Sequence, residues 1–585
     1  MNGVGVRRGR LLLALLACLA VVGGCANVPE ESTPEVVTGE RLGQISPDIP
    51  EPAKDLDVLT VVRDFVRASA RPAGDNAAAR VYLDEQARKT WRPAQGMSII
   101  ENTFGTVYAT GDARPVDPNE RVVIVRGFQV GRLGQDSAFI AAKTPYELPI
   151  RVRRQVDGQW RIVDPPANLV VTEEDFAANY FRVPVYFFAQ DPSALVPDLR
   201  YVPARPQSEL AGRVVDLLLA GPSEGLSGAV RNPLGDDAVL DNNVNPTADG
   251  ALLVPLSGLE DRSENEKQLI VAQVVRSLQN VTVSRIRILS DGAALIDGHV
   301  DWRPSELPSY EALVAPSADL PGLMVLEGRL RSLGDGRPVP GPAGAGAYDI
   351  QSAAQSIGGT QLAVVEETDD GARLRVGESG AALPVVEQTG NTLSRPTWRP
   401  SSGPNAASSE VWTAVDGEQI VRVLRTPQGG WTPQPVDATD IAAIGPITDL
   451  RLSRDGVRVA AVAGGKLVVA SVVRSSDSVT LRAPRVLQEG TLGNIVDVDW
   501  ATQDTLVVAT SLQSAPVARL PVDGLRLDKF SGSNLTPPVT AVTAAPSRST
   551  VVADSMGLWT AGDVGEVWRP HPQSPGGDAL PFYPG

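Results

Sequence analysis

The sequence predicts two α+β domains followed by an all-β propeller of about five to six blades. Three observations predict this fold class. The chain has 585 residues, whereas a single hydrophobic core seldom grows beyond roughly 250–300 residues, so several domains are expected. The first half mixes helical patterns with strand-like runs. The C-terminal part repeats one strand pattern at a spacing typical of propeller blades.

Composition limits the chemistry that the chain can perform. Its 69 acidic and 53 basic residues give a net charge of −16, which disfavours nucleic acid as a partner because nucleic acid needs a basic face. Two cysteines exclude a disulfide framework and a cysteine-rich zinc site. With only two histidines as well, we expect no transition-metal site and no cofactor. Hydrophobic residues make up 42% of the chain, which is enough to form cores.

The first 24 residues have the pattern of a secretory signal peptide. Three arginines within residues 7–10 precede the apolar run Leu11–Val22, which is too short to span about 30 Å of hydrocarbon but fits a signal. The run ends in Val-Gly-Gly-Cys at 22–25, which resembles the lipobox of bacterial lipoproteins. That resemblance implies that Cys25 carries an S-diacylglycerol group and an acylated amine, and that residues 1–24 are removed. The alternative is an ordinary cleaved signal in which Cys25 occurs by chance.

Residues 25–53 are expected to form a tether that starts at the lipidated Cys25, because prolines are interleaved with glutamates there. Removal of the signal peptide takes three arginines away and changes the net charge from −16 to −19. A chain this acidic is not attracted by anionic headgroups. Acyl chains, rather than charge, are therefore expected to hold the protein at the membrane.

Residues 54–180 are predicted to form an α+β domain. Apolar residues recur at helical spacing over Val58–Val66, and a second helical stretch covers Asn76–Trp91. Strand-like runs follow as far as Trp160–Pro166, which comes after an Asp-Gly turn. The Trp-Arg-Ile-Val-Asp-Pro-Pro ending resembles that of NTF2-like domains.

Residues 181–302 show an order of elements that resembles the GerMN domain of spore-germination proteins. The matching pieces are a Val-Tyr-Phe-Phe strand, a Leu-Leu-Leu-Ala-Gly-Pro helix end, a Leu-Val-Pro-Leu strand, a late helix and a last strand closed by Asp-Gly. They lie at 185–188, 217–222, 253–256, 264–278 and 281–292. The resemblance implies a binding module that brings no catalytic residues.

Residues 303–345 are rich in proline and glycine and are predicted to connect this domain to a propeller formed by residues 346–585. One unit recurs, in which a strand, a polar turn, an apolar strand and a short hairpin follow one another. Its intervals of 43, 54, 48 and 44 residues match the roughly 40–50 residues of a four-stranded blade. Residues 323–333 and the C-terminal tail are candidates for a further blade, and a β-sandwich is the alternative fold. The turns align at Ser356, Arg399, Ser453, Ala501 and Ala545.

One motif suggests an enzyme, but its surroundings do not. Gly221–Gly225 matches the Gly-x-Ser-x-Gly nucleophile elbow around Ser223. That elbow needs a strand before it and a histidine base. Here a predicted helix precedes it, His299 lies in a turn, and His571 lies in a proline-rich tail. We therefore expect no catalytic residue and no enzyme activity.

Two oxygen-based sites stay open. One is a calcium site at a cluster of acidic and amide side chains. Because this cluster lacks the regular spacing of an EF-hand loop, a solvated loop is the favoured interpretation. A carboxylate pair for glycoside hydrolysis is the other, although no pair stands out in the sequence. The calcium candidates are Asp236, Asp237, Asp241 and Asn242.

The lipobox, the NTF2-like region, the GerMN domain and the propeller, in this order, are similar to one family, the LpqB lipoproteins of actinobacteria. The resemblance implies a protein anchored by lipid on the extracytoplasmic face of the cell membrane. It also implies binding to the sensor kinase MtrB and modulation of the MtrA–MtrB two-component system in cell-wall homeostasis and division. Only Cys25 is carried over as a site residue. The alternative is a cell-envelope glycan-binding protein or hydrolase that uses the propeller face.

Overall fold

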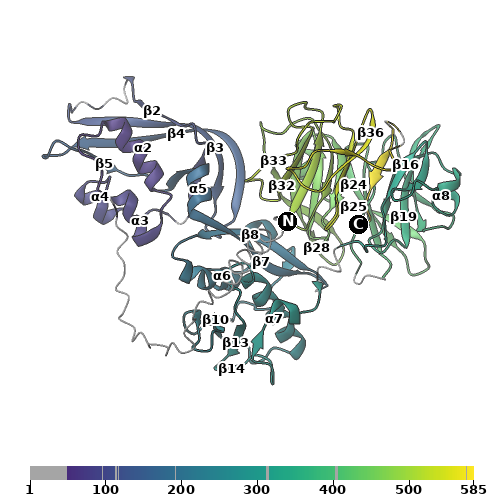
Figure 1. Cartoon of the computed structure of the whole chain (residues 1–585), viewed down its shortest axis with the longest axis horizontal. Coiled ribbons are helices and arrows are strands. Elements are labelled where there is room, and N and C mark those ends of the chain that lie inside the picture. The colour runs from purple at the N-terminus through teal and green to yellow at the C-terminus, as the bar shows by residue number, and fades with distance from the viewer. Residues whose placement is uncertain are drawn as a thin grey trace, which may run out of the picture. The chain divides into compact units, whose positions relative to one another are not determined.

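The structure is a computed structural model that describes residues 49, 51–94, 96–111, 115, 117–191, 193–310, 315–401, 406–574, 576 and 578–585. The predicted signal peptide, Cys25 and nearly all of the predicted tether lie outside the described residues. Residues 51–585 form one compact unit, which contains three domains (Figure 1). No helix in the described part of the chain is long and apolar enough to cross a membrane.

The first domain packs short helices against a six-stranded sheet. The sheet order is β5-β4-β3-β1-β6, with β2 paired to β3. Helix α2 begins after Asp57, whose carboxylate accepts the N–H groups of Leu59 and Thr60, and it buries one apolar face. The elements are α2 (Val58–Ala68), α3 (Ala73–Arg80), α4 (Glu85–Thr90), β1 (Met97–Ile100), β2 (Gly105–Tyr108), β3 (Glu120–Leu133), β4 (Phe139–Arg154), β5 (Trp160–Asp164) and β6 (Leu169–Thr172).

The second predicted helix, at 76–91, is broken into α3 and α4. Between the two helices, Leu83 forms a β-bridge with Ile162 of β5 and is buried. The carboxylate of Asp84 then caps α4 by accepting the N–H of Ala87. Contact with the sheet thus overrides a pattern that locally favours one continuous helix.

The middle domain is α+β, as predicted. Its first sheet has the order β8-β7-β9, and its second sheet places β12 parallel to β13 with α7 as the crossover between them. Helix α7 covers the predicted residues and starts with a capping box between Ser263 and Glu266. Helix α5 (Glu173–Asn179) ends the first domain and buries Phe176 in the core of that domain. The elements of the middle domain are β7 (Tyr180–Ala189), β8 (Leu195–Pro203), η2 (Gln207–Glu209), α6 (Leu210–Leu219), η3 (Glu224–Leu226), β9 (Val230–Arg231), β10 (Val239–Leu240), β11 (Asn245–Pro246), β12 (Leu252–Ser257), α7 (Glu264–Leu278), β13 (Ile286–Ser290), β14 (Ala293–Ala294), β15 (Asp301–Trp302) and η4 (Pro304–Glu306).

The third domain is a propeller, which confirms the predicted fold class. Within the described residues it has five four-stranded sheets and one three-stranded sheet. The elements are β16 (Leu323–Leu326), β17 (Arg329–Ser332), α8 (Pro342–Ala345), β18 (Ile350–Gln355), β19 (Gln361–Thr368), β20 (Gly371–Glu378), β21 (Val385–Gly390), β22 (Thr397–Trp398), β23 (Glu410–Val415), β24 (Gln419–Arg425), β25 (Trp431–Val436), α9 (Thr439–Ala442), β26 (Ile447–Leu452), β27 (Arg458–Ala463), β28 (Lys466–Arg474), β29 (Val479–Val486), β30 (Ile495–Trp500), β31 (Thr505–Thr510), β32 (Val517–Pro521), β33 (Asp528–Lys529), β34 (Ala541–Thr543), β35 (Thr550–Asp554), β36 (Gly557–Ala561), β37 (Arg569–Pro570) and β38 (Leu580–Phe582).

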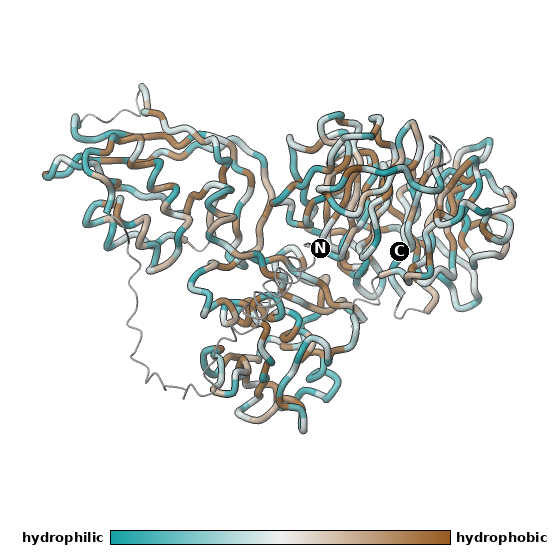
Figure 2. Tube along the Cα trace, in the orientation of Figure 1, coloured by the Kyte–Doolittle hydropathy of each residue, from teal (hydrophilic) through white to brown (hydrophobic). Residues whose placement is uncertain are grey.

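The three-stranded sheet closes the propeller ring. Strand β16 pairs with β17 on one side and with the C-terminal strand β38 on the other. The segment 303–345, expected to be a connection, therefore contributes two strands to the propeller, because pairing with the chain's last strand joins the ends of the ring. Six hydrophobic clusters follow around the ring, each formed by two neighbouring sheets. Figure 2 shows this apolar content along the strands, with hydrophilic residues concentrated in the connections.

Four of the five aligned turn positions directly follow the first strand of their blade, and Ala545 lies one residue further along the chain. Trp398 and Trp500, which stand at equivalent positions of two repeats, also make equivalent hydrogen bonds. The indole N–H of Trp398 donates to the carbonyl of Ala354, and that of Trp500 donates to the carbonyl of Arg451. In both cases the acceptor lies on the first strand of the preceding blade, so the repeat predicts contacts between blades as well as the blades themselves.

Candidate functional site

Strand β8 of the middle domain lies where all three domains meet. Eight of its nine residues are buried, although the sequence includes Asp198 and Arg200. On one side, the N–H of Tyr201 donates to the carbonyl of Ser137 in the first domain. On the other side, Arg458 and Gln503 of the propeller donate to carbonyl groups of β8, each over 2.6 Å. Val196 and Val202 of β8 pack into the core of its own domain, and contacts with the other two domains bury residues of the strand that this core does not cover.

A buried ion pair organises this junction. The side chain of Arg200 is 1% exposed, and its Nη2 lies 2.7 Å from Oδ2 of Asp198. The same guanidinium donates to the carbonyl groups of Asp136 in the first domain and Gly221 in the middle domain. Asp198 also accepts hydrogen bonds from the backbone N–H and the hydroxyl of Ser223. The charges of Asp198 and Arg200 thus neutralise each other and are both hydrogen-bonded, as the burial of a charge requires.

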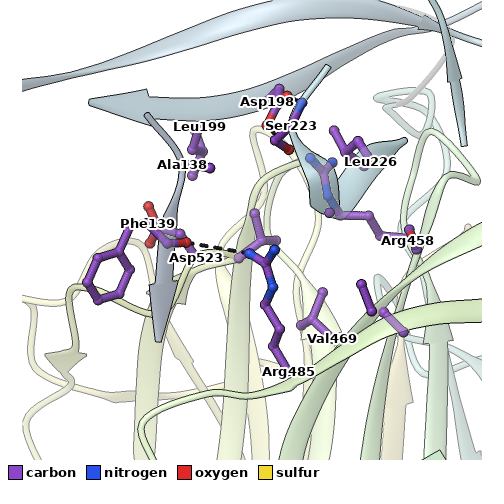
Figure 3. Close-up of a pocket in the computed structure, with 15 residues that line it drawn as sticks. Ala138, Phe139, Asp198, Leu199, Ser223, Leu226, Arg458, Val469, Arg485 and Asp523 are labelled. Carbon is purple, nitrogen blue, oxygen red and sulfur yellow. Dashed lines mark hydrogen bonds between the residues drawn. The ribbon is translucent and has the colours of Figure 1, made fainter. Parts of the chain in front are cut away.

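A second buried polar contact joins β8 to the propeller. The hydroxyl of Tyr201 donates to Oδ2 of Asp523 over 2.7 Å. Burial raises the pKa of Asp523 and also raises that of Tyr201. Figure 3 shows residues from all three domains around a cavity of about 60 Å³ at this junction, with Phe139 and Arg485 joined by a hydrogen bond. So small a space leaves room for one or two waters, so the junction is a structural joint.

The structure also places the residues of the nucleophile-like motif. Ser223 lies in a turn after α6, is 4% exposed, and donates a hydrogen bond from its hydroxyl to Asp198. His299 packs against Trp302, and Nδ1 of His571 accepts the N–H of Gln573. No contact joins either histidine to Ser223 among the described residues. The serine holds the junction together, and its surroundings differ from those of a nucleophile elbow.

The four calcium candidates lie in exposed loops around β10. Asp241 accepts the hydroxyl of Ser257, and Asp237 lies 4.0 Å from Arg262. No group of three or more histidine, cysteine or acidic side chains suited to a metal ion occurs in the described ranges. These carboxylates face protein donors and solvent, which fits the interpretation of a solvated loop.

A different set of charged residues surrounds the axis of the propeller. The inner strands β18, β22, β26, β30, β34 and β38 follow one another around this axis. Carboxylates on them bond to the next blade: Asp449 accepts the N–H of Val498, and Asp497 accepts that of Val542. Asp499 similarly accepts the N–H of Ala544. These aspartates join successive blades where a purely apolar axis would leave backbone donors unsatisfied.

The two ends of the axis differ. Where the inner strands finish, the guanidinium of Arg454 donates to the carbonyl groups of Trp500, Ala544 and Pro584, and so bridges three blades. Where the inner strands begin, a cavity of about 220 Å³ is lined by residues of all six sheets or of the segments that lead into them. The axis is therefore occupied by Arg454 at one end and hollow at the other.

Arg395 and Arg451 both line this axial cavity but are used differently. Arg451 donates to Asp449 over 2.7 Å and to Asp497 over 3.2 Å. Arg395 makes one long ion pair, of 3.9 Å, with Asp499, and no hydrogen bond from its guanidinium is found within the described residues. Burial lowers the pKa of Arg395 and raises that of Asp497 well above its usual range. Within the described residues, Arg395 is therefore a buried cation whose guanidinium lacks a hydrogen-bond acceptor.

Sequence reasoning missed both sites, and the two differ in how visible they were. The axial residues carried a signal, because Asp449 and Arg451, like Asp497 and Asp499, stand two residues apart in apolar strands. A period of two places such residues on one face, so a charged inner face was detectable. Asp198 and Arg200 show the same spacing in the apolar strand β8, but the domains that they join were not visible, since their other partners, Asp136 and Ser223, lie in segments far apart in the sequence.

Comparison with known proteins gives three family models, each of which covers one domain. "Lipoprotein LpqB, N-terminal domain" matches residues 51–177, "Sporulation and spore germination" matches 184–296, and "Lipoprotein LpqB beta-propeller domain" matches 328–584. A lipoprotein LpqB from Rhodococcus opacus is 33% identical over an alignment of 604 residues, which covers 97% of each chain. This chain belongs to the LpqB lipoprotein family.

Other LpqB lipoproteins show the same extent of similarity. Those of Mycolicibacterium smegmatis and Mycobacterium tuberculosis are 31% identical, and the alignments cover 94% and 92% of each chain, respectively. The resemblance seen in the sequence is therefore confirmed over all three domains. As an LpqB family member, the chain is a membrane-anchored lipoprotein. Its predicted lipid site, Cys25, lies outside the described residues and stays a prediction.

Proposed function

We propose that this LpqB family member lies on the extracytoplasmic face of the cell membrane, binds the sensor kinase MtrB, and modulates its signalling to MtrA. The observation that carries the proposal is the match to LpqB lipoproteins over 97% of the chain and over all three domains. The protein acts here as a binding partner, without a reaction of its own.

Two physical features support this role. A lipid on Cys25 would confine the protein to the same surface as the kinase, which raises the effective concentration of each partner for the other, so a modest contact suffices. The buried bonds at β8 tie the three domains together. Loops of a propeller can then vary around fixed strands, which suits the recognition of another protein.

Photo-crosslinking in living cells tests the proposal and identifies the domain in contact. Val156, Val283 and Met556 are exposed and lie one in each domain, so each can be replaced by a photoreactive residue with little risk to folding. We expect illumination to join the kinase to at least one of them. The yield should fall in the matched Cys25→Ala chain, which keeps the same folded domains.

Three outcomes would contradict the proposal. Capture of glycan fragments instead of a kinase would favour the glycan-binding alternative. Turnover of cell-wall polymers by the purified protein would favour a hydrolase. Equal capture of the kinase by the Cys25→Ala chain would show that binding does not depend on the lipid.

A further inference from the structure

The axial cavity carries hydrogen-bond donors that the protein itself does not use. Within the described residues, Nε of Arg395, Nε of Arg451 and the hydroxyl of Ser352 are buried and have no partner. All three residues line the same cavity. An unused buried donor costs roughly 1–3 kcal/mol, so the protein alone does not satisfy the polar groups on the residues that line this cavity.

A repeated backbone feature directs side chains into this cavity. The inner strands β18, β26 and β30 each have a β-bulge at their start, after Ile350, Ile447 and Ile495. The extra residue of each bulge lines the cavity, and bulges are typical of positions where a strand re-aims a side chain near a functional site. The same β-bulge therefore occurs at the start of the inner strand in three blades. The extra residues are Gln351, Thr448 and Val496.

We propose that the axial cavity binds a small ligand through a carboxylate that is held by the guanidinium of Arg395. Phe582 lies beside this group, with its ring centroid 5.5 Å from Cζ of Arg395, and it comes from the closing strand β38. Stacking on an aromatic ring fixes the plane of a guanidinium. The fork of N–H groups on a guanidinium matches the geometry of a carboxylate, which can accept two such hydrogen bonds side by side.

The charges and the size of the cavity favour a small, singly charged acid. The carboxylate of Asp449 lines the same cavity, and it disfavours a second negative charge on the ligand. About 220 Å³ corresponds to roughly seven waters. Leu393, Val325 and Leu580 supply apolar wall, which suits a short hydrocarbon part. Both a free acid and the carboxyl terminus of a peptide have this chemistry.

Calorimetric titration of the full lipidated chain in detergent micelles tests this site. The probes are propionate, the dipeptide Gly-Ala, its neutral amide, and inorganic phosphate. We expect both carboxylates to bind at one site and the amide to bind at least tenfold more weakly. Tighter binding of the dipeptide than of propionate would identify a peptide terminus as the natural source, and the reverse order would identify a free acid.

Variants locate the binding within the molecule. Arg395→Gln should weaken carboxylate binding at least tenfold. Val496→Trp should do the same by filling the cavity from an exposed position, and it keeps the test decisive if Arg395→Gln misfolds. Arg526→Gln changes a guanidinium whose side chain is 75% exposed, so binding should be unaffected.

The proposal is overturned by any of four results. These are equal binding of the amide and the acid, tighter binding of phosphate, undiminished binding by both cavity variants, or no saturable binding at millimolar carboxylate. The last result would mean that water, rather than a carboxylate, fills the cavity. Capture of the kinase is measured separately by the photo-crosslinking experiment, so failure of one proposal is distinguishable from failure of the other.

Discussion

Two buried arginines show how differently the same side chain is used at the domain junction and at the propeller axis. Arg200 at the junction has a side chain that is 1% exposed, and it donates to three acceptors drawn from two domains. Arg395 at the axis has a side chain that is 14% exposed, and no hydrogen bond from its guanidinium occurs among the described residues. Both charges are largely removed from bulk water, but only the first is hydrogen-bonded within the described residues.

The difference separates a structural charge from one that is available to a ligand. A buried charge that is fully bonded contributes mainly when one partner is removed, since the other is then left uncompensated. A buried charge that lacks hydrogen-bond acceptors lowers the stability of the ligand-free protein. The junction should therefore respond strongly to mutation in its stability, and the axis should respond mainly in binding.

The largest expected effect is at the junction. Asp198→Ala leaves Arg200 without its carboxylate and removes the acceptor for Ser223. We expect the local free energy of unfolding to fall by about 3–5 kcal/mol. Amide hydrogen exchange of peptides from β8 measures this locally, which is needed because a three-domain chain does not unfold in two states. The control is Asp477→Ala, in an exposed turn, and an equal change in both variants would contradict a structural role for the pair.

A smaller effect is expected where β8 meets the propeller. Tyr201→Phe removes the hydroxyl that donates to Asp523, and hydrogen bonds to charged groups contribute about 1.5–3 kcal/mol. Exchange of the segment around Asp523 should rise accordingly. Tyr180→Phe is the matched control, because Tyr180 packs on the same Phe176 and its hydroxyl meets no carboxylate in the described part of the chain.

The cost of Tyr201→Phe should also depend on pH. Burial raises the pKa of Asp523, so the folded state holds this proton more tightly than the unfolded state does. The contribution of Asp523 therefore favours folding at low pH and is lost as pH rises through its folded-state pKa. The Tyr201 hydroxyl stabilises the ionised carboxylate, so its removal should cost most above that pKa and least below it. A cost that is independent of pH would contradict this assignment.

The comparison also shows what a sequence can reveal. The blades were predictable, because each repeat encodes a turn after its first strand and a tryptophan that reaches the preceding blade. The sixth blade was only partly visible, because β16 and β38 stand far apart in the sequence and pair only in the folded ring. The break before Asp84 was not predictable from helical spacing alone, since a bridge to Ile162 causes it. Unpaired donors such as Nε of Arg395 leave no trace in a sequence at all.

The smallest expected change in stability is at the axis, with Arg395→Met. This variant removes a guanidinium that has one long ion pair, while Asp499 keeps its hydrogen bonds from Trp500, Thr543 and Ala544. Methionine fills much of the same space, so we expect exchange in β26 and β30 to correspond to a change within about 1 kcal/mol, in either direction. Combined with lost carboxylate binding, so small a change would establish Arg395 as a ligand-binding residue. A loss as large as that of Asp198→Ala would instead make it part of the structural joint between blades, and the contrast with Arg200 would disappear.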